Sequence, residues 1–318
     1  MLRRFAKRLG FAALTGTLAF GTLEAVLWLW YGEEGLLYRY ERRESMVRMD
    51  NGIFVPQPSS NLTNSDGPYT WTAHYNARGF RETEETPDEA PPGKRRLLAL
   101  GDSWIFGFSV TQGRTIADRV EARAPEFDVV NAGVFGSSAY DMLRRWNEWG
   151  SRLDLQGLIL GMPHNANRQR DASAERALFY QSPAAPAATH LKSYLWMRLL
   201  LVPMRAPKYA APNPELSSDL ADILTIARDA RDHGLQVFFL LFPVRYGGGG
   251  PGVEWQTTLA AQGVTFAGHA LKERSCWGHE DLGHPSEAGA DAIAGTLVAV
   301  LEGGPSQTVL VEEPPCAP

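Results

Sequence analysis

The chain has 318 residues, enough for one large domain or for a domain with appendages. Its hydrophobic fraction of 44% and its charged fraction of 21% are ordinary for a packed globular protein. The net charge of -5 is spread over the whole length and leaves no basic footprint, which excludes nucleic acid as a partner.

The first expected element is an N-terminal membrane segment. Residues 11–31 are apolar apart from Glu24 and a few threonines and glycines. This is about the length that crosses a hydrocarbon core of roughly 30 Å. A basic cluster precedes the segment: Arg3, Arg4, Lys7 and Arg8. We expect residues 1–31 to form a signal anchor with one transmembrane helix. A cleaved signal peptide is the alternative, although its apolar region would be shorter.

Residues 32–94 have mixed charge and no sustained periodicity. Within them, 53–55 and 69–75 have the composition of short strands, and 82–94 is acidic and rich in proline, as surface linkers are. We expect 32–94 to be a juxtamembrane segment and linker.

From residue 95 onwards, short apolar runs alternate with segments of helical periodicity. The expected strands are 97–100, 127–130, 158–160, 237–242 and 264–266, and the expected helices are 115–123, 139–149, 217–233 and 286–301. This alternation predicts an α/β fold of three layers, with a parallel sheet of about five strands between helices. We place this domain at 95–304 and a C-terminal tail at 305–318.

A long stretch, 164–216, separates the third and fourth expected strands. It contains an apolar helix candidate at 191–202, which could pack in the core or form a lid that touches the membrane. The core-packing interpretation is the commoner of the two.

The two cysteines, Cys276 and Cys316, are too few for a disulfide framework or for a zinc site made of cysteine alone. One bridge in an oxidising compartment and two free thiols are both compatible with the sequence.

Candidate catalytic residues follow the first expected strand and precede the last expected helix. Ser103 lies in a tight turn after residues 97–100, close to a helix N-terminus that favours developing negative charge. A serine hydroxyl needs a base to remove its proton, and His284 is the candidate base. Asp281 is three residues before His284 and could hold the imidazole and stabilise its charged form.

Two further strand ends offer donors for an oxyanion hole. The loop NAGVFG at 131–136 provides an unobstructed backbone N–H, best at Gly136, and the loop after 158–160 provides the side-chain amide of Asn165. An acyl-transfer site needs such donors, and the loss of one typically costs roughly 100- to 1,000-fold in rate.

These segments resemble, in order and placement, the signature blocks of the SGNH (GDSL-type) hydrolase family. The segment NARGFR at 76–81 also resembles membrane-anchored bacterial members of that family. The resemblance covers roughly 95–303 and implies a flavodoxin-like fold with a nucleophile, Ser103, and no metal or organic cofactor. It further implies that Asp281 and His284 complete the triad, and that Gly136 and Asn165 join the Ser103 N–H as oxyanion donors.

The sequence departs from the family pattern after the third strand. Family members usually have Asp directly after the oxyanion Asn, whereas Ala166 stands here, so the donor could shift to Asn167.

The function expected from these residues is hydrolysis of an acyl ester, O-acetyl or another short acyl group, on a carbohydrate or lipid. The partners would be a small-molecule or glycan ester and, through residues 11–31, the membrane. The same triad could instead transfer the acyl group to a cell-envelope glycan, or the fold could serve as a non-catalytic, membrane-anchored binding protein. Basic residues also follow the apolar segment closely, at Arg39, Arg42, Arg43 and Arg48, so that a plain count of them does not set the orientation. The cluster before the segment is the more compact, which favours a single-pass protein of the cell inner membrane whose catalytic domain is periplasmic or otherwise extracytoplasmic.

Overall fold

The computed structural model defines two compact units, Met1–Ser45 with Arg176–Ala210, and Met46–Glu175 with Ala211–Pro318. The residues described by the structure are 2–31, 47–50, 53–64, 70–134, 137–161, 216–242, 253–268, 271, 274–277 and 284–306. The helix candidate at 191–202 therefore lies outside the described residues.

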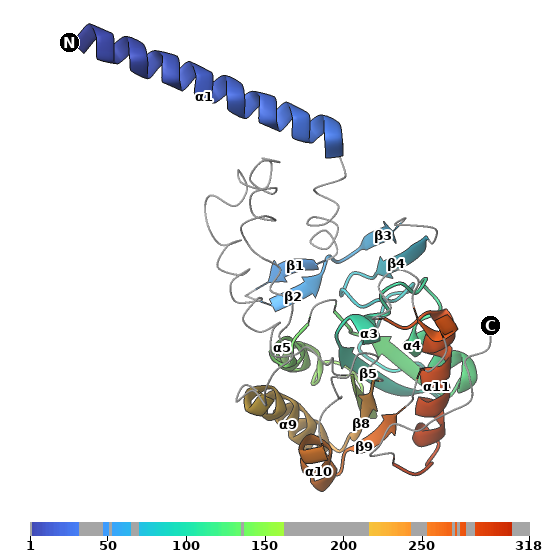
Figure 1. Cartoon of the computed structure of the whole chain (residues 1–318). Helices are drawn as coiled ribbons and strands as arrows, with labels where there is room; N and C mark the ends of the chain where they lie inside the picture. The colour runs from blue at the N-terminus through green and yellow to red at the C-terminus, as the bar shows by residue number, and fades with distance from the viewer. Residues whose placement is uncertain are drawn as a thin grey trace. The chain divides into compact units, whose positions relative to one another are not determined.

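A five-stranded parallel sheet forms the centre of the second unit (Figure 1). Its strands, in spatial order, are β6 (Phe127–Asn131), β5 (Arg95–Gly101), β7 (Gly157–Gly161), β8 (Gln236–Leu241) and β9 (Thr265–Gly268). Every neighbouring pair is parallel. The strands are buried on both faces because β-branched and leucine side chains point alternately into two separate cores.

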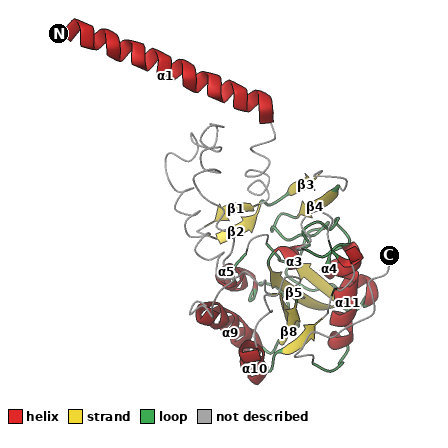
Figure 2. Cartoon of the chain, in the orientation of Figure 1, coloured by secondary structure: helices red, strands yellow, loops and turns green. Residues whose placement is uncertain are grey.

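Helices cover both faces of this sheet, which confirms the three-layer α/β prediction (Figure 2). On one face, Leu98 and Leu100 of β5 belong to a core shared with three helices. These helices are α5 (Ala139–Trp149), α9 (Leu216–Asp232) and α10 (Val253–Ala261). On the other face, Leu97 and Ala99 pack with α4 (Ile116–Arg123) and α11 (Glu287–Leu301). Of these helices, α10 alone was missing from the expected set.

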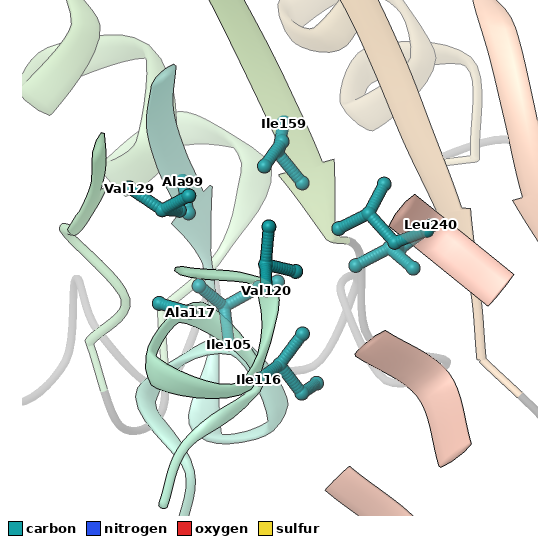
Figure 3. Close-up of a pocket in the computed structure, with 9 residues that line it drawn as sticks. Ala99, Ile105, Ile116, Ala117, Val120, Val129, Ile159 and Leu240 are labelled. Atoms are coloured by element: carbon teal, nitrogen blue, oxygen red, sulfur yellow. The ribbon is translucent and has the colours of Figure 1, made fainter. Parts of the chain in front are cut away.

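A small apolar pocket lies in the core between the sheet and α4 (Figure 3). Its lining side chains are Ala99, Ile105, Ile116, Ala117, Val120, Val129, Ile159, Leu240 and Leu297. None of them carries a polar group, so this pocket is a gap in the hydrophobic core and not a catalytic cleft.

Two antiparallel hairpins precede the sheet in the chain. The first joins β1 (Val47–Asp50) to β2 (Ile53–Pro56), and the second joins β3 (Ser60–Asn64) to β4 (Trp71–Tyr75). Alternate residues of β4 are buried, and Trp71, Ala73 and Tyr75 share an apolar cluster with Phe106 and Val134. The expected strand at 53–55 is thereby confirmed, and the one expected at 69–75 is observed at Trp71–Tyr75.

The N-terminal helix α1 spans Leu2–Tyr31 in the first unit. It contains a stretch, Gly10–Leu27, that is long and apolar enough to cross a membrane. Large apolar side chains on it are exposed, among them Phe11, Leu18 and Leu29. The helix has the properties of a membrane anchor or of a signal sequence.

Candidate active site

Ser103 is the first residue of a short helix, α3 (Ser103–Phe106), that starts directly after β5. The chain turns tightly because Gly101 lacks a side chain: a Cβ there would lie 2.3 Å from Ile105 Cγ1 and 2.5 Å from the Gly161 carbonyl oxygen. Asp102 caps the helix, since its Oδ1 accepts a hydrogen bond from the Trp104 N–H at 3.0 Å. The turn thus places Ser103 at the carboxyl edge of the sheet, where parallel sheets bind ligands.

His284 is positioned by the start of the last helix. Pro285 pairs with Trp277, and the Ser286 N–H donates to the Cys276 carbonyl oxygen at 2.9 Å. The Ser286 hydroxyl donates to the Ser275 carbonyl oxygen and accepts from the Gly289 N–H, which caps α11. A Cβ at Gly289 would lie 2.1 Å from the Cys276 carbonyl oxygen, so this approach requires glycine.

The structure brings Ser103 and His284 into direct contact. Ser103 Oγ and His284 Nε2 are 2.8 Å apart, although the two residues are separated by 181 positions in the chain. The Ser103 side chain is buried and the imidazole is half-buried. This is hydrogen-bonding distance for transfer of the serine proton to the imidazole.

Asp102 is a second partner of the serine hydroxyl. Its Oδ2 accepts from Ser103 Oγ at 3.1 Å. Burial raises the pKa of Asp102 to about 6, while the hydrogen bond from the Trp104 N–H and the charge of His284 oppose this shift. Near neutral pH the Asp102 carboxylate is mostly ionised and competes with His284 for the Ser103 proton. The distance from Ser103 Oγ to Asp102 is longer than that to His284.

The chain beyond β6 runs beside the catalytic turn. The Ala132 and Val134 N–H groups donate to the carbonyl oxygens of Ala99 and Gly101, at 2.9 and 3.0 Å. A Cβ at Gly133 would lie 2.3 Å from the Phe106 nitrogen. The loop that leads to Gly136 therefore leaves the sheet against α3.

The remaining expected site residues cannot be placed. Asp281, Gly136, Asn165 and the alternative donor Asn167 all lie outside the described residues. Their roles stay predictions.

Two aromatic rings contact or border the imidazole of His284. The Phe108 ring centroid is 4.8 Å from that of His284, and Trp104 is 6.4 Å away. Phe242 and Trp277 support Trp104, at 4.7 and 5.8 Å. Trp71 of β4 packs edge-on against Phe108 at 5.3 Å. The partly exposed imidazole thus has two partly exposed aromatic side chains near it.

Comparisons with known proteins give only distant likenesses. No family model and no curated protein sequence matches this chain. Three solved structures with similar folds are TesA, a lipolytic protein of the G-D-S-L family from Veillonella parvula, and AlinE4, an SGNH-hydrolase family esterase. Their sequences are 15%, 12% and 13% identical to this chain, with TM-scores of 0.44, 0.42 and 0.36.

These likenesses are confined to part of the chain. They cover 65%, 66% and 56% of it, and 98%, 99% and 77% of the respective relatives. Two of the three are described as members of the family that the sequence motifs resemble. Likeness at this level assigns neither activity nor substrate to this chain, so its function has to rest on the site itself.

Three residues of the site were not singled out by the sequence. Asp102 carries a usable signal, because Asp is a preferred helix cap directly before a predicted helix start. Trp104 and Phe108 carry none, since aromatic residues after a strand are as common in cores as in binding sites. Only the fold shows that their rings border His284.

Proposed function

We propose that this chain is a serine ester hydrolase of the SGNH type. The observation that carries the proposal is the 2.8 Å separation of Ser103 Oγ and His284 Nε2 at the carboxyl edge of a parallel sheet. A buried serine within hydrogen-bonding distance of an imidazole is the arrangement that activates a hydroxyl for attack on a carbonyl carbon.

The proposed reaction has two halves. Ser103 Oγ forms a bond to the ester carbonyl carbon while His284 Nε2 takes the hydroxyl proton. The tetrahedral intermediate then collapses, and the alkoxide leaving group departs with the proton from His284. A water molecule, deprotonated by His284, then attacks the acyl-enzyme. The bond between the acyl carbon and Ser103 Oγ breaks, the acid leaves, and His284 returns the proton to Ser103 Oγ.

The remaining roles are proposed from the sequence motifs. Asp281 would accept a hydrogen bond from His284 Nδ1 and stabilise the imidazolium. The Ser103 N–H, Gly136 and Asn165 would donate to the oxyanion. The proposed substrate is an O-acetyl or other short acyl ester of a carbohydrate or lipid.

We further propose that α1 anchors the chain in an inner membrane, with the catalytic unit on the extracytoplasmic side. The basic cluster before the apolar stretch is more compact than the one after it, which favours this orientation. Cys276 is disulfide-bonded, which fits an oxidising compartment.

The test is active-site labelling of the full-length protein in detergent with a fluorophosphonate probe. We expect labelling of the wild type and its loss in Ser103→Ala and His284→Ala. The matched controls are Ser151→Ala and His233→Ala, which change exposed residues on the surface of the same unit. Folded wild-type protein that fails to react would contradict the proposal.

A second measurement separates hydrolysis from acyl transfer. In this measurement the wild type alone is used. It is supplied with an acetylated monosaccharide, with and without an unacetylated oligosaccharide acceptor. Release of free acetate without acceptor supports the hydrolase, whereas turnover that depends on the acceptor supports a transferase with the same nucleophile.

A further inference from the structure

Arg81 is a buried cation bound by backbone carbonyls. It lies six residues after β4 and is 1% exposed. Its guanidinium donates at 2.6 Å to the carbonyl oxygens of both Phe106 and Gly107. Further acceptors are the carbonyl oxygens of Val110 and of Thr72, the latter at 3.1 Å, and Gln112 Oε1 at 3.3 Å.

The acceptors of Arg81 among the described residues are all neutral. Burial lowers the pKa of Arg81 to about 10, so the side chain stays charged at neutral pH. The guanidinium also lies over the Phe106 ring, 4.4 Å from its centroid. Because the hydrogen-bond acceptors of this buried charge among the described residues are carbonyl oxygens and not carboxylates, the charge needs them to remain in place, which couples Arg81 tightly to the loop that provides most of them.

That loop, 107–110, directly follows the helix of the nucleophile. Gly107 and Ser109 both have positive φ values, 85° and 66°. The Ser109 value is unfavourable for a residue with a side chain, and such conformations persist only where the surroundings fix them. Three of the carbonyl groups that converge on Arg81 belong to Phe106, Gly107 and Val110, on either side of this reversal.

Phe108 connects the loop to the backbone of Ser103 and to the side chain of His284. Its N–H donates to the Ser103 carbonyl oxygen at 2.9 Å, and its ring lies 4.8 Å from the imidazole of His284. A shift of the loop would therefore move the Phe108 ring, which contacts the imidazole of His284, relative to Ser103.

The segment that carries Arg81 is also tied to the end of β6. The Arg81 N–H donates to the Asn131 carbonyl oxygen at 2.9 Å, and Glu82 Oε1 accepts from the Asn131 N–H at 2.7 Å. β6 is an edge strand, so this pairing covers its open side just before the loop that leads to Gly136.

We propose that Arg81 is a positioning residue of the active site. Its guanidinium holds the loop 107–110 so that Phe108 keeps the His284 imidazole directed at Ser103 Oγ. The inference rests on the proposed hydrolase function and extends the active-site scaffold to a residue that precedes the sheet.

The experiment compares Arg81→Lys and Arg81→Met with the same changes at Arg96. Arg96 is a fair control because it too is 1% exposed. It binds Asp128 and the Pro87 carbonyl oxygen at the opposite end of β5 from Ser103. Both pairs of variants lose a buried guanidinium, but only the Arg81 pair frees the loop 107–110.

Hydrolysis of p-nitrophenyl acetate by full-length protein is measured well below the melting temperature of each variant. We expect kcat to fall by about 10- to 100-fold in both Arg81 variants, with KM nearly unchanged, because small misplacement of catalytic groups has effects of this size. Lysine should not rescue, since it cannot bridge several carbonyls as the planar guanidinium does. Amide hydrogen exchange at 107–110 should accelerate in the Arg81 variants only.

The results separate the two proposals. Wild-type protein without activity and without fluorophosphonate labelling would remove the hydrolase function. An active wild type with Arg81 variants that match the Arg96 variants in kcat and in exchange at 107–110 would overturn the positioning role alone. If Arg81→Met does not fold, Phe108→Leu replaces it, and full kcat in that variant would overturn the role equally.

Discussion

Two acidic side chains, Asp102 and Glu82, lie beside the loops that carry the candidate site, and burial raises the pKa of both. Asp102 has partners for both carboxylate oxygens, the Trp104 N–H and the Ser103 hydroxyl. Asp102 thus caps the helix that begins with Ser103 and is, beside His284, a second hydrogen-bond partner of the Ser103 hydroxyl.

Glu82 leads to a prediction about pH and stability. Burial raises the pKa of Glu82 to about 8, and the nearby Asp118, Glu121 and Asp128 act in the same direction, while the Asn131 N–H opposes it. The folded protein therefore keeps a proton on Glu82 that the unfolded chain releases near pH 4.5. Between these values, rising pH favours the unfolded state.

We expect the free energy of unfolding of the wild type to fall between pH 5 and 8 relative to that of Glu82→Gln, by up to about 3 kcal/mol, because each pH unit between the two pKa values is worth about 1.4 kcal/mol. Urea titrations of both proteins at several pH values measure this difference. Glu89→Gln, a change at an exposed residue, is the control and should follow the wild type. Parallel curves for wild type and Glu82→Gln would contradict the shift.

At the scale of single elements, the first three strands of the sheet were predictable because 97–100, 127–130 and 158–160 are each a mainly apolar run followed by glycine or asparagine. Residues 97–100 and 158–160 both end next to glycines, Gly101 and Gly161, whose missing Cβ atoms admit Ile105. Such local signals are enough to place Ser103 after a strand and His284 before a helix.

The role of Arg81 could not be predicted in the same way. Its acceptors are carbonyl oxygens up to 29 positions away, and any residue type can supply a carbonyl. The contacts of Phe108 and Trp104 with His284 could not be predicted either, because the identity of an aromatic residue does not show which ring it will contact. Long-range contacts of the backbone, and not residue identity, determine this part of the site.

The element that holds His284 is itself fastened by a disulfide. Cys276 is disulfide-bonded, and the only other cysteine of the chain, Cys316, lies outside the described residues. Because the Cys276 carbonyl oxygen accepts from the Ser286 N–H, loosening the turn η1 (Arg274–Cys276) should disturb the start of α11.

We therefore expect reduction with dithiothreitol to lower the melting temperature, since loss of a native disulfide typically costs about 2–5 kcal/mol. Esterase activity should fall with it. Cys276→Ser should show both losses without reductant and no further response to it. A wild type that is equally stable and active with and without dithiothreitol would show that the bridge does not support His284.

At the scale of the whole molecule, the apolar helix α1 and the catalytic unit differ in how much apolar surface they expose. Exposed Phe11, Leu14 and Leu18 favour lipid, whereas the second unit encloses its apolar side chains in cores on both faces of the sheet. The catalytic unit should therefore not depend on α1 for its fold.

Deletion of residues 2–31 tests this separation. We expect the shortened protein to appear in the soluble fraction and to react with the fluorophosphonate probe at the rate of the full chain, because no residue of the candidate site lies in α1. The full chain should resist extraction from membranes by alkaline carbonate and retain its N-terminus in intact-mass measurements. A mature chain that begins after residue 31 would instead identify α1 as a signal sequence, because a leader is removed whereas an anchor must stay covalently attached.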